Sequence, residues 1–180
     1  MRLSLHHHPD GVAATSPNCV LYDVERDEAS ISPAEVPGPA LSWRLHDGEA
    51  PGDAVLSAAV ELDPSMGWLM RCDRVDFGPG GIAYRHTHPG PGIRYLLFGE
   101  ITIETEGSTR TYGPGEAWFE RGPDPVLATT TEREASAFAR VLLLPEEYAG
   151  RRTIRYVDPA DADKPKTQRA TVFLEHPVQR

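Results

Sequence analysis

The chain has 180 residues, of which 39% are hydrophobic and 25% charged, a composition typical of a globular domain with a sizeable core. Its net charge is −9 at pH 7 and it has no basic cluster, which argues against nucleic acid or an anionic membrane as a partner. No apolar run approaches the roughly 20 residues of a membrane span. We therefore expect a cytoplasmic protein. Its two cysteines, Cys19 and Cys72, could pair, but free, reduced thiols are the expectation in that compartment.

The predicted elements fall into three parts along the chain. Residues 1–53 are expected to form an N-terminal extension and connector, loosely ordered over residues 1–18 and extended over the proline-rich residues 32–40. Residues 54–145 are expected to form a β-barrel, because short apolar runs alternate there with Gly/Pro turns. Residues 146–180 are expected to be a C-terminal extension that packs on the barrel or on a partner.

Strands are predicted wherever apolar residues alternate between two turns. Within the barrel they are residues 55–62, 67–77, 82–88, 93–98, 100–105, 109–113, 117–120, 126–130 and 135–144. A short helical turn at "PEEYAG" and two further strands, near residues 152–157 and 169–175, are predicted after the barrel. So many short strands separated by Gly/Pro turns predict an all-β fold, a sandwich or a barrel.

The motif that carries chemistry is "YRHTHPGPGIRYLLFGE", residues 84–100. Side chains two residues apart lie on the same face of a strand, so Tyr84, His86 and His88 are predicted to share one face. Two adjacent imidazoles on one strand suit a divalent metal ion, although a lone His-x-His is weak evidence by itself.

The spacing of Gly80, His86, His88 and Gly99 resembles the first motif of the cupin superfamily, G(x)5HxH(x)3–4E(x)6G. Downstream, "YGPGEAWFERGPDP" is similar to the second cupin motif. The resemblance spans roughly residues 67–145. It implies a cupin-type jelly-roll β-barrel with strand extensions at both ends, a site inside the barrel mouth, and a metal ion held by both motifs.

Two of the four metal-ligand positions implied by this resemblance hold residues whose side chains cannot bind a metal. The glutamate position of the first motif is Gly92, and the histidine position of the second is Val126. We therefore expect a divalent ion (Fe, Zn, Mn or Ni) to be held only weakly, by His86 and His88, with no organic cofactor. A further ligand would come from outside the usual positions, with Glu120 as the first candidate and Tyr84 and His176 behind it.

Three other side chains are candidates for the site. Arg94 follows the vacated glutamate position by one alternation step, so it either attracts an anionic ligand or pairs with Glu100 or Glu120. Glu120 shares a face with Trp118 and is a metal ligand or general base if that face points inward, and surface charge if it points outward. Tyr84 places a phenol in the pocket or belongs to the core.

These observations favour a small-molecule enzyme that acts on an anionic or enolisable substrate in the barrel mouth. An isomerase, a cyclase or dehydratase, a decarboxylase and an oxygenase all remain open. The alternatives are a metal-free enzyme that uses histidine as acid and base, and a non-catalytic small-molecule-binding barrel. We also predict a homodimer, because a cupin barrel leaves one sheet face and its edges to be covered by a neighbour.

Overall fold

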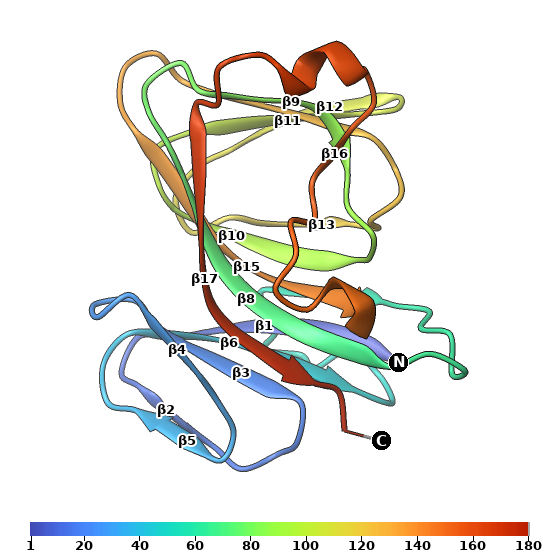
Figure 1. Ribbon diagram of the computed structural model, residues 1–180. Helices are drawn as coiled ribbons and strands as arrows, with labels where there is room; N and C mark the ends of the chain where they lie inside the picture. Colours follow the sequence, from blue (N-terminus) through green and yellow to red (C-terminus); the bar gives the residue numbers. More distant parts are fainter. Residues whose placement is uncertain (180) are drawn as a thin grey trace.

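Three five-stranded antiparallel sheets stack as layers in the computed structural model, which describes residues 1–179 (Figure 1). We call them the N-terminal, central and outer sheets. The N-terminal sheet has the order β4-β3-β6-β1-β7, with bounds β1 Arg2–His8, β3 Cys19–Asp23, β4 Glu28–Ile31, β6 Ala40–His46 and β7 Leu56–Ala59. A two-stranded sheet of β2 (Val12–Ala14) and β5 (Ala34–Val36) lies beyond it.

The central and outer sheets form the barrel-like part of the fold. The central sheet has the order β13-β10-β15-β8-β17, with bounds β13 Ala117–Glu120, β10 Gly92–Phe98, β15 Ser136–Pro145, β8 Trp68–Phe77 and β17 Gln168–Pro177. The outer sheet has the order β12-β11-β14-β9-β16, with bounds β12 Ser108–Tyr112, β11 Ile101–Thr105, β14 Val126–Thr130, β9 Ile82–Thr87 and β16 Arg155–Tyr156. Residues 1–179 also contain two short 3₁₀ helices, η1 Glu146–Tyr148 before β16 and η2 Pro159–Ala162 before β17.

The predicted all-β, barrel-like fold is confirmed. Each strand from residue 67 to residue 145 begins and ends within one or two residues of its prediction, and the helical turn at "PEEYAG" is η1. Both predicted C-terminal strands also form, and within one chain they add to the edges of the outer and central sheets as β16 and β17. Cys19 and Cys72 are both free and buried.

The expectation of a loosely ordered N-terminus was wrong. Residues Arg2–His8 form β1, which lies between β6 and β7 in the N-terminal sheet. Its alternating leucines, Leu3 and Leu5, are completely buried together with Trp43 of β6. Because an alternating apolar face must be covered, this strand is as firmly built into the core as those of the barrel.

The middle of the central sheet is buried on both of its faces. All ten residues of β15 are buried. Ala139, Val141 and Leu143 join the core shared with the N-terminal sheet, whereas Phe138 and Arg140 point the other way, into the space below the outer sheet. A strand covered on both faces reads as one continuous apolar run, which explains the sequence "AFARVLLL".

The N-terminal sheet covers the face of the central sheet that a partner was expected to cover. The homodimer therefore remains a prediction that the contacts within one chain neither require nor oppose. Within residues 1–179, none of the helical segments has the length and apolar character of a membrane span.

Substitution of Trp43 tests the packing of the N-terminal sheet against the central sheet. The Trp43 side chain is 0% exposed, and its indole Nε1 donates a hydrogen bond of 3.1 Å to the backbone oxygen of Ile93 in the central sheet. We expect Trp43→Ala to lower the free energy of unfolding by about 3–5 kcal/mol, as for other buried aromatic truncations. Trp68→Ala, at a half-buried tryptophan, is the control and should cost less. Chemical denaturation followed by circular dichroism measures both, and an equal or smaller loss for Trp43→Ala would contradict the proposed covering role.

Candidate functional site

A cavity of about 570 Å³ lies between the central and outer sheets. One part of its wall is apolar and comes from both sheets, with Val75, Phe77, Trp118 and Phe138 from the central sheet and Ala83, Ile103, Val126 and Ala128 from the outer sheet. Most of the remaining wall residues are polar or charged, and they include both histidines of the His-x-His motif. An enclosed apolar wall with a few converging polar groups is typical of a small-molecule site.

A bulge in β9 turns both histidines into this cavity. His86 lies opposite Val126 of β14, but Ala83, not Tyr84, lies opposite Ala128, so β9 has one extra residue in this stretch. The extra residue lets Ala83, His86 and His88 all line the cavity. The prediction that His86 and His88 point inward agrees with this geometry, whereas the shared face predicted for Tyr84 was wrong. The ring of Tyr84 instead lies 4.6 Å from the Nζ atom of Lys164.

The hydrogen bond of His86 fixes which of its nitrogens can accept a proton. Its Nδ1 lies 2.7 Å from the backbone oxygen of Tyr84, which can only accept, so Nδ1 carries the hydrogen. The lone pair is therefore on Nε2. Burial lowers the pKa of His86 below its ordinary value, and the carboxylate of Glu120 opposes part of this shift. His86 is thus a neutral imidazole at pH 7 with one basic nitrogen.

In His88, by contrast, the basic nitrogen is already occupied by a hydrogen bond from Arg140. Arg140 Nη1 lies 3.3 Å from His88 Nε2, and since a guanidinium can only donate, the lone pair of Nε2 is already engaged. Burial first, and then the charges of Arg140 and Arg94, lower the pKa of His88 well below its ordinary value. His88 therefore stays neutral and holds Arg140 in place.

Four charged side chains form a row across the central sheet, in which two neighbouring arginines lie between two carboxylates. Arg140 donates to Asp73 on the neighbouring strand, with Nε 2.6 Å from Oδ1. Arg94, directly opposite Arg140 on β10, forms an ion pair of 2.6 Å from Nη2 to Glu120 Oε2. Each cation is thus matched by a carboxylate, as buried charges require.

Arg94 lies behind the cavity. It is completely buried, donates to the backbone oxygen of Gly92 at 2.7 Å, and is absent from the cavity wall. Burial lowers its pKa to about 10, so it remains a cation at neutral pH. Of the two roles left open by the sequence, the structure shows the pairing with Glu120.

Glu120 faces inward and lines the cavity beside Trp118. Both of its oxygens are engaged, since Oε1 accepts a 2.9 Å hydrogen bond from Trp118 Nε1 and Oε2 meets Arg94. His176, the remaining ligand candidate, lies on β17 away from the cavity wall. Catalytic roles for Glu120 and Tyr84 stay predictions. The carboxylate of Glu120 interacts with the side chains of Trp118 and Arg94.

The two vacated positions of the motif differ in the space they offer. A Cβ atom at Gly92 would lie 2.5 Å from the backbone oxygen of Val141, so no larger side chain fits there. Val126 is buried, lines the cavity and stands opposite His86. Only the second position could therefore accept an additional imidazole.

These residues do not fit a resident divalent ion. No group of three or more histidine, cysteine or acidic side chains in residues 1–179 is arranged to hold a metal. The lone pair of His88 faces the guanidinium of Arg140, whose positive charge opposes a cation at that place. Weak binding of a divalent ion by His86 and His88 remains a prediction, which a metal titration can test.

Sequence reasoning missed the charged residues contributed by the central sheet and by the C-terminal segment. They are Arg71, Asp73, Arg140, Glu175, Arg151, Arg152 and Lys166, all in the cavity wall. The signal for the first three was present, because "LMRCDRVDF" and "FARVLL" place charges inside otherwise apolar strands. Only the register of four strands shows which of these charges face one another.

No family model matches the sequence, and no curated protein matches it either. Among solved structures, polyketide cyclase RemF from Streptomyces resistomycificus is 25% identical, with a TM-score of 0.41 over 49% of this chain. KdgF from Halomonas sp. is 22% identical, with a TM-score of 0.37 over 45% of this chain and 73% of its own. TT1209 from Thermus thermophilus is 21% identical, with a TM-score of 0.36 over 48% of this chain and 90% of its own. The match to RemF spans 61% of that protein.

The two neutral histidines predict an acid-sensitive fold. Their pKa values in the folded chain lie below the unfolded value near 6.5, so below that pH the unfolded chain binds more protons. Their contribution to stability is complete above pH 6.5 and is lost as the pH falls toward the folded pKa values. Between pH 7.5 and 5.5 we expect the free energy of unfolding to fall, and His88→Gln to flatten that slope by up to about 1.4 kcal/mol per pH unit. His7→Gln, at an exposed histidine, should leave the slope unchanged, and denaturation at several pH values measures this.

Val126→His tests the metal argument. It would place a third imidazole opposite His86, where the second cupin motif would have one. We expect this variant to bind Zn²⁺ at least tenfold more tightly than the wild type in calorimetric titration. His86→Ala combined with Val126→His is the control and should lose that gain. A wild type that already binds as tightly as Val126→His would show that His86 and His88 suffice, contrary to the donor set described above.

Proposed function

We propose that this chain is a cupin-type barrel that transforms an organic small molecule by proton transfer, with His86 as the acid–base group. The observation that carries the proposal is the fixed tautomer of His86, whose lone pair is on Nε2 while its other nitrogen is held by the backbone of Tyr84. A positioned imidazole with a pKa near or below neutrality suits a general base at pH 7.

In the proposed step, His86 Nε2 removes a proton from a carbon next to a carbonyl group, and the electron pair moves onto the carbonyl oxygen. The imidazolium then returns the proton to the same substrate at another atom, so no oxidant or co-reactant is needed. Glu120 lies close enough to favour the charged form of His86 electrostatically. These steps describe an isomerase that acts on an enolisable compound. In a cyclase the enolate carbon would attack a second carbonyl carbon of the same substrate, whose C=O π electrons would move onto oxygen, and that alkoxide would take the proton from His86.

Arg140 is the group that we propose stabilises the negative oxygen. It lines the cavity, and Asp73 and His88 accept three of its hydrogen bonds. A guanidinium has five N–H groups, so two remain for a ligand. Because Asp73 and His88 hold it from two sides, Arg140 needs no reorganisation when charge develops on the substrate. The apolar wall around Trp118 and Phe138 would hold the body of the substrate.

Deuterium exchange tests the proposal. We expect the wild type to accelerate exchange of the α-protons of 1-tetralone or 4-phenyl-2-oxobutanoate in D₂O, measured by NMR. His86→Gln should slow that exchange by at least about a hundredfold, as expected for the loss of a general base. His7→Gln, at an exposed histidine outside the cavity, is the matched control and should exchange like the wild type.

The outcomes separate the candidate functions. Equal rates for the wild type and His86→Gln would refute the role of His86. Binding of these ketones without any acceleration would support the non-catalytic small-molecule-binding barrel in place of an enzyme.

A further inference from the structure

The charges deep in the cavity cancel, but those at its mouth do not. The wall contains five lysine or arginine side chains and only three carboxylates. Each carboxylate already has an arginine, in the pairs Arg71–Glu175, Arg140–Asp73 and Arg94–Glu120. The surplus of positive charge therefore belongs to the other three cations of the wall, which are Arg151, Arg152 and Lys166.

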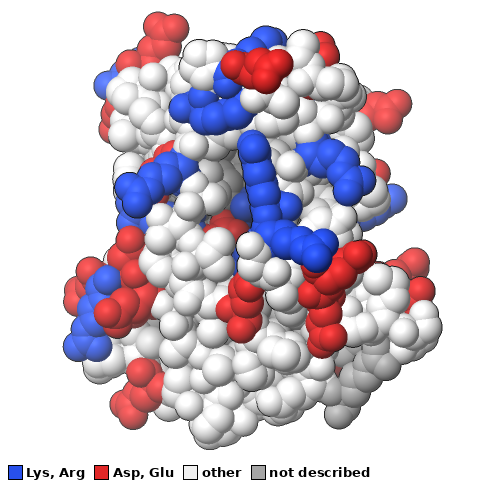
Figure 2. Space-filling model, viewed as in Figure 1, with Lys and Arg blue, Asp and Glu red and all other residues white. Residues whose placement is uncertain are grey.

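These three cations are exposed at the open side of the cavity, and Lys166 donates to the backbone oxygens of Asp161 and Ala162. Within residues 1–179 none of them forms an ion pair with a carboxylate, although 27 acidic residues make the chain as a whole strongly negative. Figure 2 shows lysine and arginine side chains around the hollow in the middle of this face. A local positive mouth on an acidic protein concentrates anions, because a cleft focuses the field of its lining charges.

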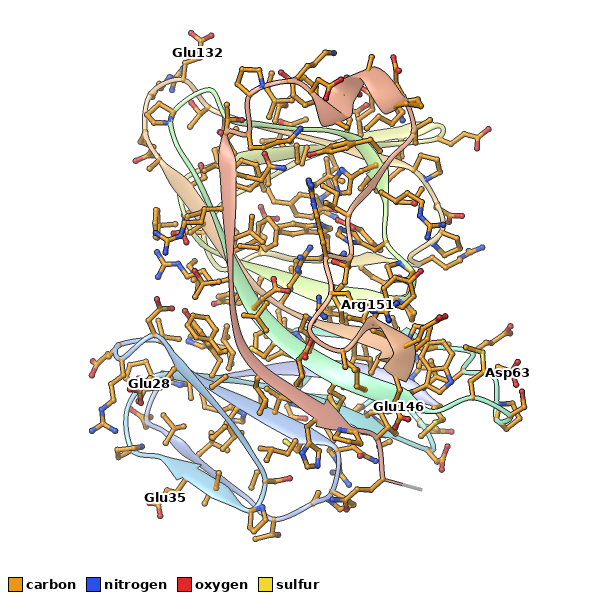
Figure 3. All side chains as sticks on the ribbon, viewed as in Figure 1. Glu28, Glu35, Asp63, Glu132, Glu146 and Arg151 are labelled. Atoms are coloured by element: carbon orange, nitrogen blue, oxygen red, sulfur yellow. The ribbon has the colours of Figure 1, made fainter. Side chains whose placement is uncertain are left out.

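The segment that carries two of them is fixed to the central sheet. Arg71 donates to the backbone oxygens of Tyr148 at 2.7 Å and Arg151 at 2.9 Å, and Glu175 accepts from the backbone nitrogen of Gly150 at 2.8 Å. From there the chain rises to β16 in the outer sheet (Figures 1 and 3), and Figure 3 labels Arg151 on this segment. The pair of buried Arg71 and half-buried Glu175 thus holds the segment of Arg151 and Arg152 at the mouth.

An aromatic ring supports the other side of the mouth. The guanidinium of Arg152 lies 5.5 Å, and Nζ of Lys166 4.5 Å, from the ring centre of Tyr156. Tyr156 is paired with His86 across β16 and β9. Both cations are therefore held at the strand that borders the acid–base group.

We propose that Arg151, Arg152 and Lys166 form an anion subsite at the mouth, which binds the carboxylate or phosphate of an otherwise apolar substrate. The apolar body of the substrate lies inward against Trp118 and Phe138, with its charged group toward solvent. This deepens the proposed function by naming the substrate class. It also assigns anion recognition to the mouth, since the charge of Arg94 is matched by Glu120 behind the wall.

Three ligands of one shape test the subsite: 2-naphthoate, 2-naphthyl phosphate and the uncharged 2-naphthalenemethanol. We expect the wild type to bind at least one of the two anions tenfold or more tightly than the alcohol in calorimetry. The anion that binds more tightly identifies the head group. The triple variant Arg151→Gln, Arg152→Gln, Lys166→Gln should bind all three compounds with affinities within about threefold of one another.

A charge-matched control removes three cations elsewhere. Arg44, Arg133 and Arg169 are exposed and do not line the cavity, so changing all three to Gln should preserve the preference for anions. The subsite is refuted if the wild type has no preference, if no naphthyl compound binds, or if the mouth variant keeps the preference. His86→Gln should retain it, so loss of proton exchange and loss of anion preference report separately on the proposed function and on the subsite.

Discussion

Pairing of buried charge on one face of the central sheet is the constraint on which the site depends. Glu120, Arg94, Arg140 and Asp73 stand in a row across four neighbouring strands, and each cation meets a carboxylate. An unpaired ion at this depth would cost several kcal/mol, so the strand register and the row must form together. The N-terminal sheet covers the opposite face of the same strands and excludes water from it, so the site depends on that sheet as well.

The row also separates the roles of two histidines that look equivalent in the sequence. Arg140 occupies the lone pair of His88, whereas His86 is held through its other nitrogen and keeps a basic atom available. The same pairs match the inner charges of the cavity, whereas Arg151, Arg152 and Lys166 at its mouth form no ion pair within residues 1–179. In the proposed function this arrangement provides a base at His86, a donor at Arg140 and an entrance that attracts anions.

Much of this fold was predictable because alternation and Gly/Pro turns mark each barrel strand. The strands before residue 54 were not predicted, although "RLSLH" and "ALSWRLH" alternate as clearly as the barrel strands. The prolines near these segments favour a loop or an extended connector, and that signal outweighed the alternation. The inward direction of His86 and His88 was also predictable, but the position of Tyr84 was not. A bulge adds one residue to β9, and a prediction from simple alternation cannot anticipate it.

The pairing of the charged side chains in the site could not be predicted from the sequence for a different reason. Arg94 was identified next to a vacated ligand position, but whether it serves a ligand or a neighbour depends on which strand lies beside β10. In the structure that strand is β13, which supplies Glu120, and on the other side β15, which supplies Arg140. Register therefore decides what surrounds Gly92 and the histidines: the backbone of β15 closes the space beside Gly92, and β15 also brings the guanidinium of Arg140 to His88.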